Sequence, residues 1–330
     1  MTKPYIIAEI ASAHEGDPKL CSRLINLAAG TGADAVKLQI FQRDALLSRF
    51  HAKFASFGEI EIAPADWRRL LVEAKATGRD VIVEAFDDRS LAIAVDSGAV
   101  TAYKLPTSDI GNLDFIRNAA RTGRRIYLGV GGATESEINS AVRAIYPSLA
   151  HDLVLMHGFQ AFPTKLEDTN LDRIARLKAE YGLPMAYADH VDAEDKEMAR
   201  ALPLMALAAG AVVIEKHITD DRSRKGRDHY SSLNPDEFAD FVILMRRAAS
   251  VIGSPDPALT EAETSYRNLM KKQAVAAVLL AAGAPLAADC VAYKRTGLAG
   301  LSPSRIAELV GRKIKSAKVV DQPLLAQDFE

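Results

Sequence analysis

VVIEKH, residues 212–217, is a short apolar run that ends on charged and imidazole side chains. Reading outward from it, the preceding run PMAYADH, residues 184–190, also ends on a histidine. The earlier runs of this kind are YIIAE (5–9), AVKLQ (35–39), DVIVE (80–84), AYK (102–104), RIYLG (125–129) and DLVLMH (152–157). Amphipathic helical stretches separate these runs. The alternation predicts a (β/α)8 barrel, whose active site lies where the strands end.

Helices are expected between and after these strands. The expected ranges are residues 18–31, 64–77, 88–97, 112–122, 134–146, 171–181, 195–209 and 235–252. Several begin at cap or first-turn signals such as Asn234-Pro235, and several end near a glycine. The loop of residues 41–63 is long for a barrel and contains aromatic residues, which favours a lid or binding element over a merely disordered loop.

The chain is expected to contain two domains. The barrel is predicted to span residues 1–253, and the Pro-rich, then polar segment 254–270 has the composition of a linker. Residues 271–330 predict two short strands around a Gly-Ala-Pro turn, followed by a small helix at residues 303–310. Such a small β-rich module buries little surface alone, so we expect it to pack on the barrel or on another subunit.

Composition excludes several classes of partner. The 41 basic and 43 acidic residues nearly balance, without a basic run, which argues against nucleic acid and anionic membranes. Cys21 and Cys290 share no motif spacing, so neither a disulfide framework nor a Cys-x-x-Cys zinc site is expected. The N-terminus does not resemble a signal peptide, and no apolar stretch approaches the roughly 20 residues that cross a bilayer. The expected location is therefore the cytoplasm.

Two histidines end the last two predicted strands. His190 and His217 should both project into the barrel mouth, within reach of one cation. Neutral imidazole suits Mn, Fe, Co or Zn better than Mg, and the neighbouring Asp189 and Glu215 strengthen the metal hypothesis. The alternative is that one histidine only hydrogen-bonds its neighbours. Glu9, at the end of the first strand, is a candidate third ligand or general base.

Two lysines lie at the ends of the second and fourth predicted strands. Lys37 and Lys104 would be buried amines, and a phosphorylated or carboxylated ligand would supply the anionic partner that they need. The structural alternative pairs them with Glu9 and Glu84. A Schiff base on either lysine is less favoured, because a metal and a lysine nucleophile are usually alternative ways to activate a carbonyl.

At these residues the chain resembles the sialic acid synthase family, whose members condense phosphoenolpyruvate with N-acetylmannosamine or related sugars. The segments that carry the resemblance are IIAEIASAHEGD (6–17), GADAVKLQ (32–39), AYKLPTSDIGNL (102–113), YADH (187–190) and GAVVIEKHITDDRSRKGRDHYSSLNPDEF (210–238). KKQAVAAVLLAAGAPLAADCVAYKRTG (271–297) is similar to the family's C-terminal SAF, or antifreeze-like, domain. The resemblance covers essentially the whole chain.

The resemblance implies catalytic roles for single residues. His190 and His217 would hold a divalent metal, typically Mn²⁺, with Mg²⁺ or Co²⁺ as alternatives. Lys37 and Lys104 would bind phosphoenolpyruvate, and Glu9 would position the reacting centre. The metal would act as a Lewis acid on the aldehyde oxygen of the sugar while C3 of phosphoenolpyruvate attacks.

The resemblance also implies a set of substrate-binding residues: Gln39, Thr107, Asp109, Gln160, Asp228 and Arg295. Asp228 would hydrogen-bond the sugar. Arg295 would reach from the C-terminal domain of a partner subunit to the acyl group of the sugar, which implies a domain-swapped homodimer.

Four positions depart from the family's pattern of hydroxyl or amide donors to phosphate: Glu84, Gly129, Gln160 and Ala188. Each lost donor to a charged group costs about 1.5–3 kcal/mol, although the glycine run of residues 129–132 could compensate as an anion-binding nest. A carboxylate at Glu84 either repels the phosphate or pairs with Lys104 and faces away.

Three activities are therefore compatible with the sequence. Phosphoenolpyruvate condensation with an unusual sugar is favoured. The alternatives are a metal-dependent aldolase or lyase that uses pyruvate or another 2-oxo acid, and non-catalytic sugar binding.

Overall fold

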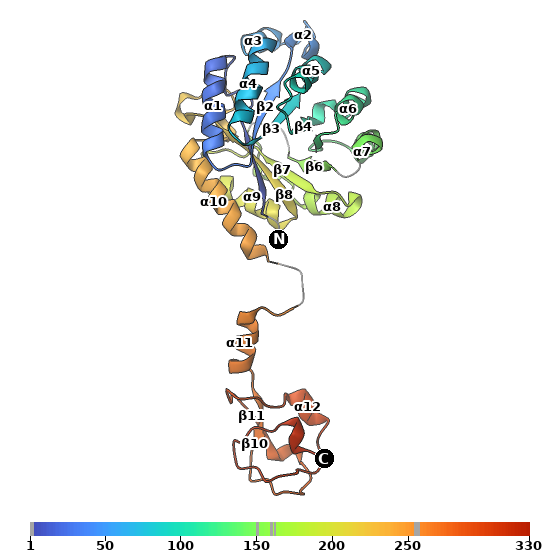
Figure 1. Cartoon of the computed structure of the whole chain (residues 1–330), viewed down its shortest axis with the longest axis vertical. Coiled ribbons are helices and arrows are strands. Elements are labelled where there is room, and N and C mark those ends of the chain that lie inside the picture. The colour runs from blue at the N-terminus through green and yellow to red at the C-terminus, as the bar shows by residue number, and fades with distance from the viewer. Residues whose placement is uncertain (1–2, 150–151, 159–160, 162, 254–257) are drawn as a thin grey trace. The chain divides into compact units, whose positions relative to one another are not determined.

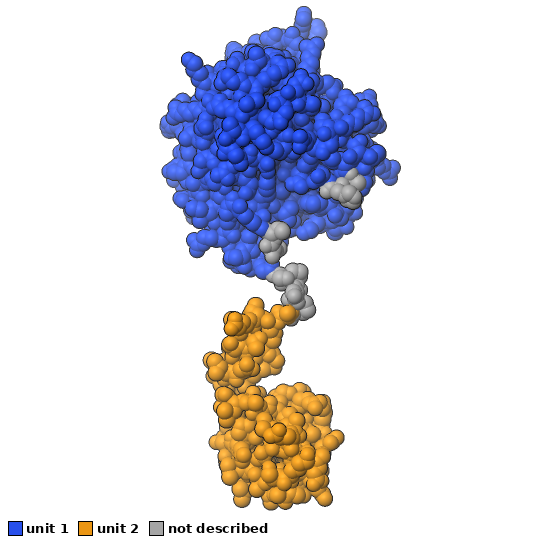
Figure 2. All heavy atoms as spheres, in the orientation of Figure 1, with its two compact units in different colours: residues 1–254 blue, residues 255–330 orange. Residues whose placement is uncertain are grey.

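The computed structural model describes residues 3–149, 152–158, 161, 163–253 and 258–330. The chain divides into two compact units, Met1–Ser254 and Pro255–Glu330, which Figure 2 distinguishes by colour. No described helix is both long enough and apolar enough to cross a membrane.

Parallel strands close into a barrel in the first unit (Figure 1). The barrel strands are β1 (Tyr5–Glu9), β2 (Ala35–Ile40), β3 (Asp80–Ala85), β4 (Ala102–Leu105), β5 (Arg125–Gly129), β6 (Leu153–His157), β7 (Met185–Asp189) and β8 (Ala211–Ile218). Each strand pairs with the next, and β1 also pairs with β8, which closes the sheet. The short strand β9 (Ser232–Leu233) extends it beside β8. The (β/α)8 barrel predicted from the alternating pattern is confirmed.

Helices follow the strands and cover the outside of the barrel (Figure 1). They are α1 (Pro18–Gly30), α4 (Pro64–Ala76), α5 (Asp88–Asp96), α6 (Leu113–Ala120), α7 (Glu135–Leu149), α8 (Asp172–Tyr181), α9 (Met198–Ala208) and α10 (Pro235–Ile252). α1 shows how the sequence sets their ends. Asp17 accepts a hydrogen bond from the Lys19 amide, and Pro18 occupies the first turn, where a missing N–H costs little.

Two apolar layers stabilise the barrel. The outer layer lies between strands and helices and includes Trp67, Leu70 and Phe238. The inner layer fills the barrel and includes Ile7 and Ile82. Because side chains alternate along a strand, the residues two positions later on the same strands also face the interior. On β1, β2, β3, β4 and β8 these later positions carry charged side chains, which places a polar layer above the apolar one.

The long loop of residues 41–63 is ordered around two short helices, α2 (Arg43–Leu46) and α3 (Phe54–Glu59). The Arg43 guanidinium carbon lies 4.3 Å from the centre of the Phe54 ring, a cation–π contact that joins the two helices. The loop of residues 41–63 is therefore ordered, and the alternative of a disordered loop is wrong.

The second unit has its own small core. β10 (Gln273–Ala276) pairs antiparallel with β11 (Val291–Lys294), and α12 (Pro303–Ala307) follows. Ala274, Leu286, Ile314 and Phe329 are among the residues buried between these elements and the loops. The interval expected to be a linker contains a helix, α11 (Glu261–Met270), begun by a capping box at Thr260. The similarity of this unit to a SAF domain remains a prediction.

Candidate active site

The strand register gathers charged side chains inside the barrel, at the carboxyl ends of its strands. Glu9 is the cross-strand partner of Lys37 on β2, and Glu84 on β3 is the partner of Lys104 on β4. Glu215, on β8, follows the interior residue Val213 by two positions and faces the same way. Sequence reasoning noted Glu215 only as a neighbour of the histidines, although strand alternation alone could have placed it in the interior.

These five side chains form one buried ionic cluster. The Lys37 amine lies 2.6 Å from Glu9 Oε2, 2.8 Å from Glu215 Oε1 and 2.9 Å from Glu84 Oε2. The Lys104 amine lies 3.1 Å from Glu215 Oε1 and 3.3 Å from Glu84 Oε2. None of the five is more than 2% exposed. Both lysines thus have carboxylate partners from the protein itself, as in the structural alternative, with Glu215 added.

The cluster shifts the pKa of its members in opposite directions. Burial lowers the pKa of Lys37 to about 8, although Glu215 and Glu84 oppose the shift. Burial also disfavours the charged form of Lys104, but Glu215 and Glu84 outweigh it and raise its pKa. For Glu84 and Glu215, burial raises the pKa, and the two lysines more than offset it, so both values lie below the ordinary range. Both carboxylates are therefore ionised at neutral pH.

His190 and His217 lie beside this cluster, on adjacent strand ends. Their ring centroids are 5.2 Å apart, and each residue is 3% exposed. Burial lowers the pKa of His190 to about 4 and that of His217 well below its ordinary value. Both rings are therefore neutral at pH 7, the form that ligates metals. The described residues contain no group of three or more His, Cys, Asp or Glu placed to hold a metal, so the pair would supply two ligands.

An ion pair behind the two histidines joins their strands. Lys216 Nζ lies 2.6 Å from Asp189 Oδ2, and both side chains are fully buried. The Tyr187 hydroxyl donates to the other carboxylate oxygen at 3.2 Å. Asp189 is thus committed to a structural pair, whereas the sequence suggested it as a neighbour that strengthens the metal site.

A cavity of about 340 Å³ opens above the cluster. Its described lining residues are Ala11, Ser12, Gln39, Lys53, Phe57, Ile60, Glu84, Phe86, Lys104, His190, Glu215, His217, Arg227 and Asp228. Lys53, Phe57 and Ile60 come from the loop of residues 41–63, which therefore forms one wall. This volume lies in the range of small-molecule sites.

Arg227 and Asp228 also line the cavity. The Arg227 side chain donates to the Ser56 carbonyl at 3.4 Å and lies 3.9 Å from Glu59, so it bridges to the loop of residues 41–63. Asp228 has a left-handed backbone, with φ 58°, and its carboxylate accepts from the Ser12 amide at 2.9 Å. Burial raises the pKa of Asp228.

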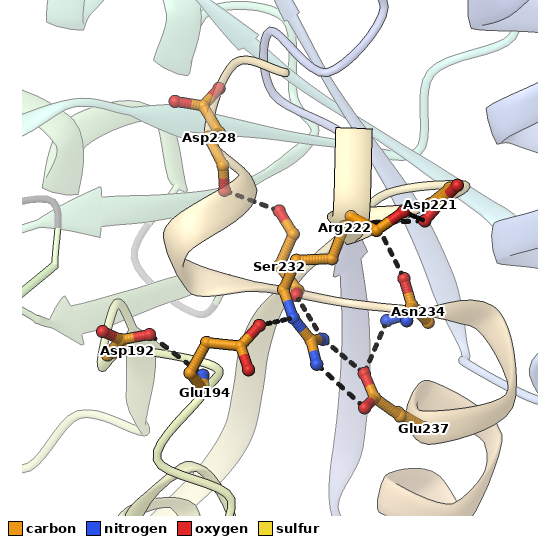
Figure 3. Close-up of polar contacts among 9 residues, drawn as sticks. Asp192, Glu194, Asp221, Arg222, Asp228, Ser232, Asn234 and Glu237 are labelled. Carbon is orange, nitrogen blue, oxygen red and sulfur yellow. Dashed lines mark hydrogen bonds and ion pairs between the residues drawn. The ribbon is translucent and has the colours of Figure 1, made fainter. Parts of the chain in front are cut away.

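Arg222, which the sequence interpretation missed, anchors the segment that carries Asp228 (Figure 3). Its guanidinium donates to Glu194 at 2.8 Å, to both oxygens of Glu237, and to the Ser232 carbonyl at 3.1 Å. The Ser232 hydroxyl in turn donates to the Asp228 carbonyl at 2.7 Å. The bidentate contact with Glu237 at the start of α10 holds this connection against the barrel. No short motif marks Arg222 in the sequence.

Of the predicted substrate-binding residues, Gln39 and Asp228 are among the described lining residues of the cavity. Thr107 and Asp109 form a short 3-10 helix after β4 and are not among the described lining residues. Asp109 instead lines a neighbouring pocket with Arg89 and Asn112. Gln160 lies outside the described residues. Arg295 is exposed and belongs to the second unit, just after β11.

Glycines at the end of β5 and just after β5 and β6 permit close backbone packing. A Cβ at Gly131 would lie 1.9 Å from the Gly158 carbonyl oxygen, and a Cβ at Gly158 would lie 2.2 Å from the Ala188 carbonyl oxygen. A Cβ at Gly129 would similarly lie 2.9 Å from the Thr107 backbone nitrogen. Steric need explains these glycines without an anion nest, and none of them is among the described lining residues of the cavity.

The sequence matches one protein family and its characterised members over most of its length. The model of the NeuB family matches residues 24–256. The N,N'-diacetyllegionaminic acid synthase of Legionella pneumophila is 28% identical, over 99% of this chain and 94% of its own length. The N-acetylneuraminate-9-phosphate synthase of Homo sapiens is also 28% identical, over 94% of this chain and 88% of its own length.

A solved structure of a sialic acid synthetase has the same fold as this chain. The N-acetylneuraminic acid synthetase of Leptospira borgpetersenii, solved in complex with citrate, superposes with a TM-score of 0.73 at 29% identity. The superposition covers 82% of this chain and 93% of that one.

Proposed function

The chain belongs to the NeuB family, and from that premise we propose that it condenses phosphoenolpyruvate with an aldose. It is a carbon–carbon bond-forming enzyme, and its relatives are synthases of legionaminic and sialic acids. The product of the proposed reaction is an acid of the nonulosonic class, formed with release of phosphate. The aldose would resemble N-acetylmannosamine.

One observation carries the proposal: the buried Lys104 amine and two neutral imidazoles line one cavity at the carboxyl ends of the barrel strands. The Lys37 amine lies beside Lys104 in the ionic cluster, where both contact Glu84 and Glu215. Lys37 and Lys104 would bind the acid groups of the donor, and Gln39, which donates to Glu84 at 3.3 Å, would assist. Asp228, held by the Ser12 amide, would accept a hydrogen bond from an acceptor hydroxyl.

The two histidines fit a divalent metal as a pair of neutral nitrogen donors on adjacent strands. His190 and His217 would hold it, with Mn²⁺ the first choice. When bound, it would supply Lewis-acid polarisation of the aldehyde. Glu9 would position the reacting centre through its contact with Lys37 at 2.6 Å. C3 of phosphoenolpyruvate then attacks the aldehyde carbon, water adds at C2, and phosphate leaves.

Phosphate release tests this function directly. The purified full chain is incubated with phosphoenolpyruvate and Mn²⁺ across a panel of aldoses, and phosphate is measured. Release that depends on the sugar supports the condensation and identifies the acceptor. Release that is absent with every sugar contradicts it.

A second function is favoured by one specific contact, the pairing of Glu84 with both lysines. A metal-dependent aldolase that uses pyruvate needs no phosphate site, and Glu84 would oppose its monoanionic substrate less than a phosphate ester. Pyruvate consumption with the same aldose panel, without phosphate release from phosphoenolpyruvate, would favour this function.

A further inference from the structure

We propose that Glu84 is an internal counter-anion: its carboxylate occupies the lysines that bind the donor, and the acid groups of the donor must displace it. The proposal rests on the proposed function for the identity of the donor. It assigns Glu84 a role in setting donor affinity.

The position of one oxygen carries the first step. Glu84 Oε2 lies 2.9 Å from the Lys37 amine, 3.3 Å from the Lys104 amine and 3.3 Å from the Gln39 amide nitrogen. These three groups are the ones assigned to the donor. An anion that contacts both amines from the cavity has to take the place of this oxygen.

The crowding of the Lys37 amine carries the second step. Oxygens of three different carboxylates lie within 2.9 Å of it. It donates a hydrogen bond to Glu84 Oε2 at 2.9 Å, whereas Glu9 Oε2 has no hydrogen-bond donor among the described residues. Acceptors are in excess, because Glu215 Oε2 is buried without a hydrogen-bond donor among the described residues. A donor anion can bind Lys37 only if one of the three carboxylates moves away.

Glu84 is the carboxylate that yields. Glu9 is held in place by the Ala11 amide at 2.7 Å as well as by Lys37, and it is not among the described lining residues of the cavity. Glu215 contacts both lysines more closely than Glu84 does. Glu84 and Glu215 both line the cavity, and of these two carboxylates Glu84 makes the longer contacts with each lysine.

The net charge of the cluster also opposes binding of an anionic donor. The cluster holds three carboxylates against two ammonium groups, so its formal charge is −1 before any ligand enters. Like charges held a few ångströms apart in a poorly screened site repel strongly. A phosphate-bearing donor is therefore opposed more than a donor that carries only one carboxylate.

The test is a binding measurement without the sugar, so that no turnover is needed. Titration calorimetry on the full chain gives the dissociation constants of phosphoenolpyruvate, inorganic phosphate and pyruvate. Glu84→Gln keeps the shape and removes the charge. We expect phosphoenolpyruvate and phosphate to bind at least about tenfold tighter, and pyruvate to gain less. The matched control is Glu167→Gln, an exposed carboxylate in the short 3-10 helix Leu166–Asp168, which should leave all three constants unchanged.

Unchanged or weaker phosphoenolpyruvate binding by a folded Glu84→Gln protein overturns the proposal, because Glu84 would then support the lysines. If the Glu84→Gln protein does not unfold cooperatively on heating, Glu84→Ser is used as the second variant. The wild-type chain gives an independent test. A crystal structure with bound phosphate must show Glu84 displaced from at least one lysine, and an anion bound beside both intact contacts contradicts the competition.

Failure of the proposed function gives a different result. If Glu84→Gln binds phosphate more tightly but neither protein releases phosphate with any aldose, Glu84 competes with anions and the assigned reaction is wrong. If wild-type protein turns over and Glu84→Gln binds no better, the reaction stands and the role of Glu84 is wrong.

Discussion

Lys216 and Asp189 form a fully buried ion pair at 2.6 Å, and the residues that follow them in the chain are His217 and His190. The pair joins β8 to β7 at the level where the two imidazoles begin. It lies on the other side of the strands from the cavity, because side chains alternate. The position of His190 relative to His217 therefore depends on the Lys216–Asp189 ion pair, in which neither histidine takes part.

Lys216→Met should weaken metal binding without removing a ligand. The change leaves Asp189 buried and unpaired, which costs about 3–5 kcal/mol of the free energy of unfolding. Loss of a supporting partner typically lowers metal affinity about 10–100-fold. Mn²⁺ titration and chemical denaturation measure the two effects. Arg125→Met, which breaks the half-exposed pair with Asp152, should change stability by less than about 1 kcal/mol. Equal effects of the two variants would contradict the prediction.

His217→Ala should abolish metal binding and turnover together, because it removes one of two imidazole donors. Activity should fall by at least about a hundredfold, more than for loss of a supporting residue. His157→Gln is the matched control. His157 is also buried at a strand end, but its ring contacts the Thr169 carbonyl at 2.9 Å and it is not among the described cavity residues. Wild-type activity that persists in excess chelator would rule out the metal.

Stability should fall as the pH drops from 6.5 towards 4, in part through His14. This side chain is 1% exposed and packs edge-on against Trp67. Burial lowers its pKa from 6.5 to about 4, so between these values the unfolded chain binds the proton that the folded chain excludes. The contribution of His14 is complete above pH 6.5, and about 3 kcal/mol is lost by pH 4.

His14→Gln tests this dependence, because glutamine does not titrate. Unfolding by urea at several pH values should give a shallower slope for the variant between pH 6.5 and 4. The remaining slope is expected from the other buried histidines. Identical slopes for the two proteins would mean that His14 accepts a proton in the folded state.

Arg295→Ala tests the proposed role of the second unit. If Arg295 of a partner subunit contacts the sugar, the KM for the aldose should rise about 10–100-fold and the KM for the donor should stay constant. Arg312→Ala, another arginine of the second unit, is the control. Both KM values staying at wild-type levels would exclude a role for Arg295 in sugar binding.

Much of the fold could be predicted because a barrel repeats one local pattern. The runs that end at Glu9, Glu84 and His217 mark strands, and closure between β1 and β8 follows from their number. The pattern carried less information where the chain does not repeat. The interval expected as a linker contains α11, whose residues are all exposed, so apolar periodicity gave no signal for it.

The site was harder to predict than the barrel. Strand ends identified Lys37, Lys104 and both histidines, because position along a barrel strand fixes which side chains meet. The sequence could not decide whether Glu84 faces a bound phosphate or pairs with Lys104 and faces away, since that depends on the distances between side chains of three strands. Arg227 and Lys53 were missed because they lie in loops, where no periodicity shows which residues face the cavity.

The location of Glu84 also bears on how the reaction cycle ends. In the proposed reaction, once phosphate has separated from the product, the two lysines exchange it for a carboxylate that is already tethered beside them. Such an exchange leaves no interval in which the amines are unpaired, and it shortens the residence time of phosphate. We expect phosphate to be a weak product inhibitor of this enzyme, and loss of the tethered carboxylate to make phosphate departure the slow step of turnover.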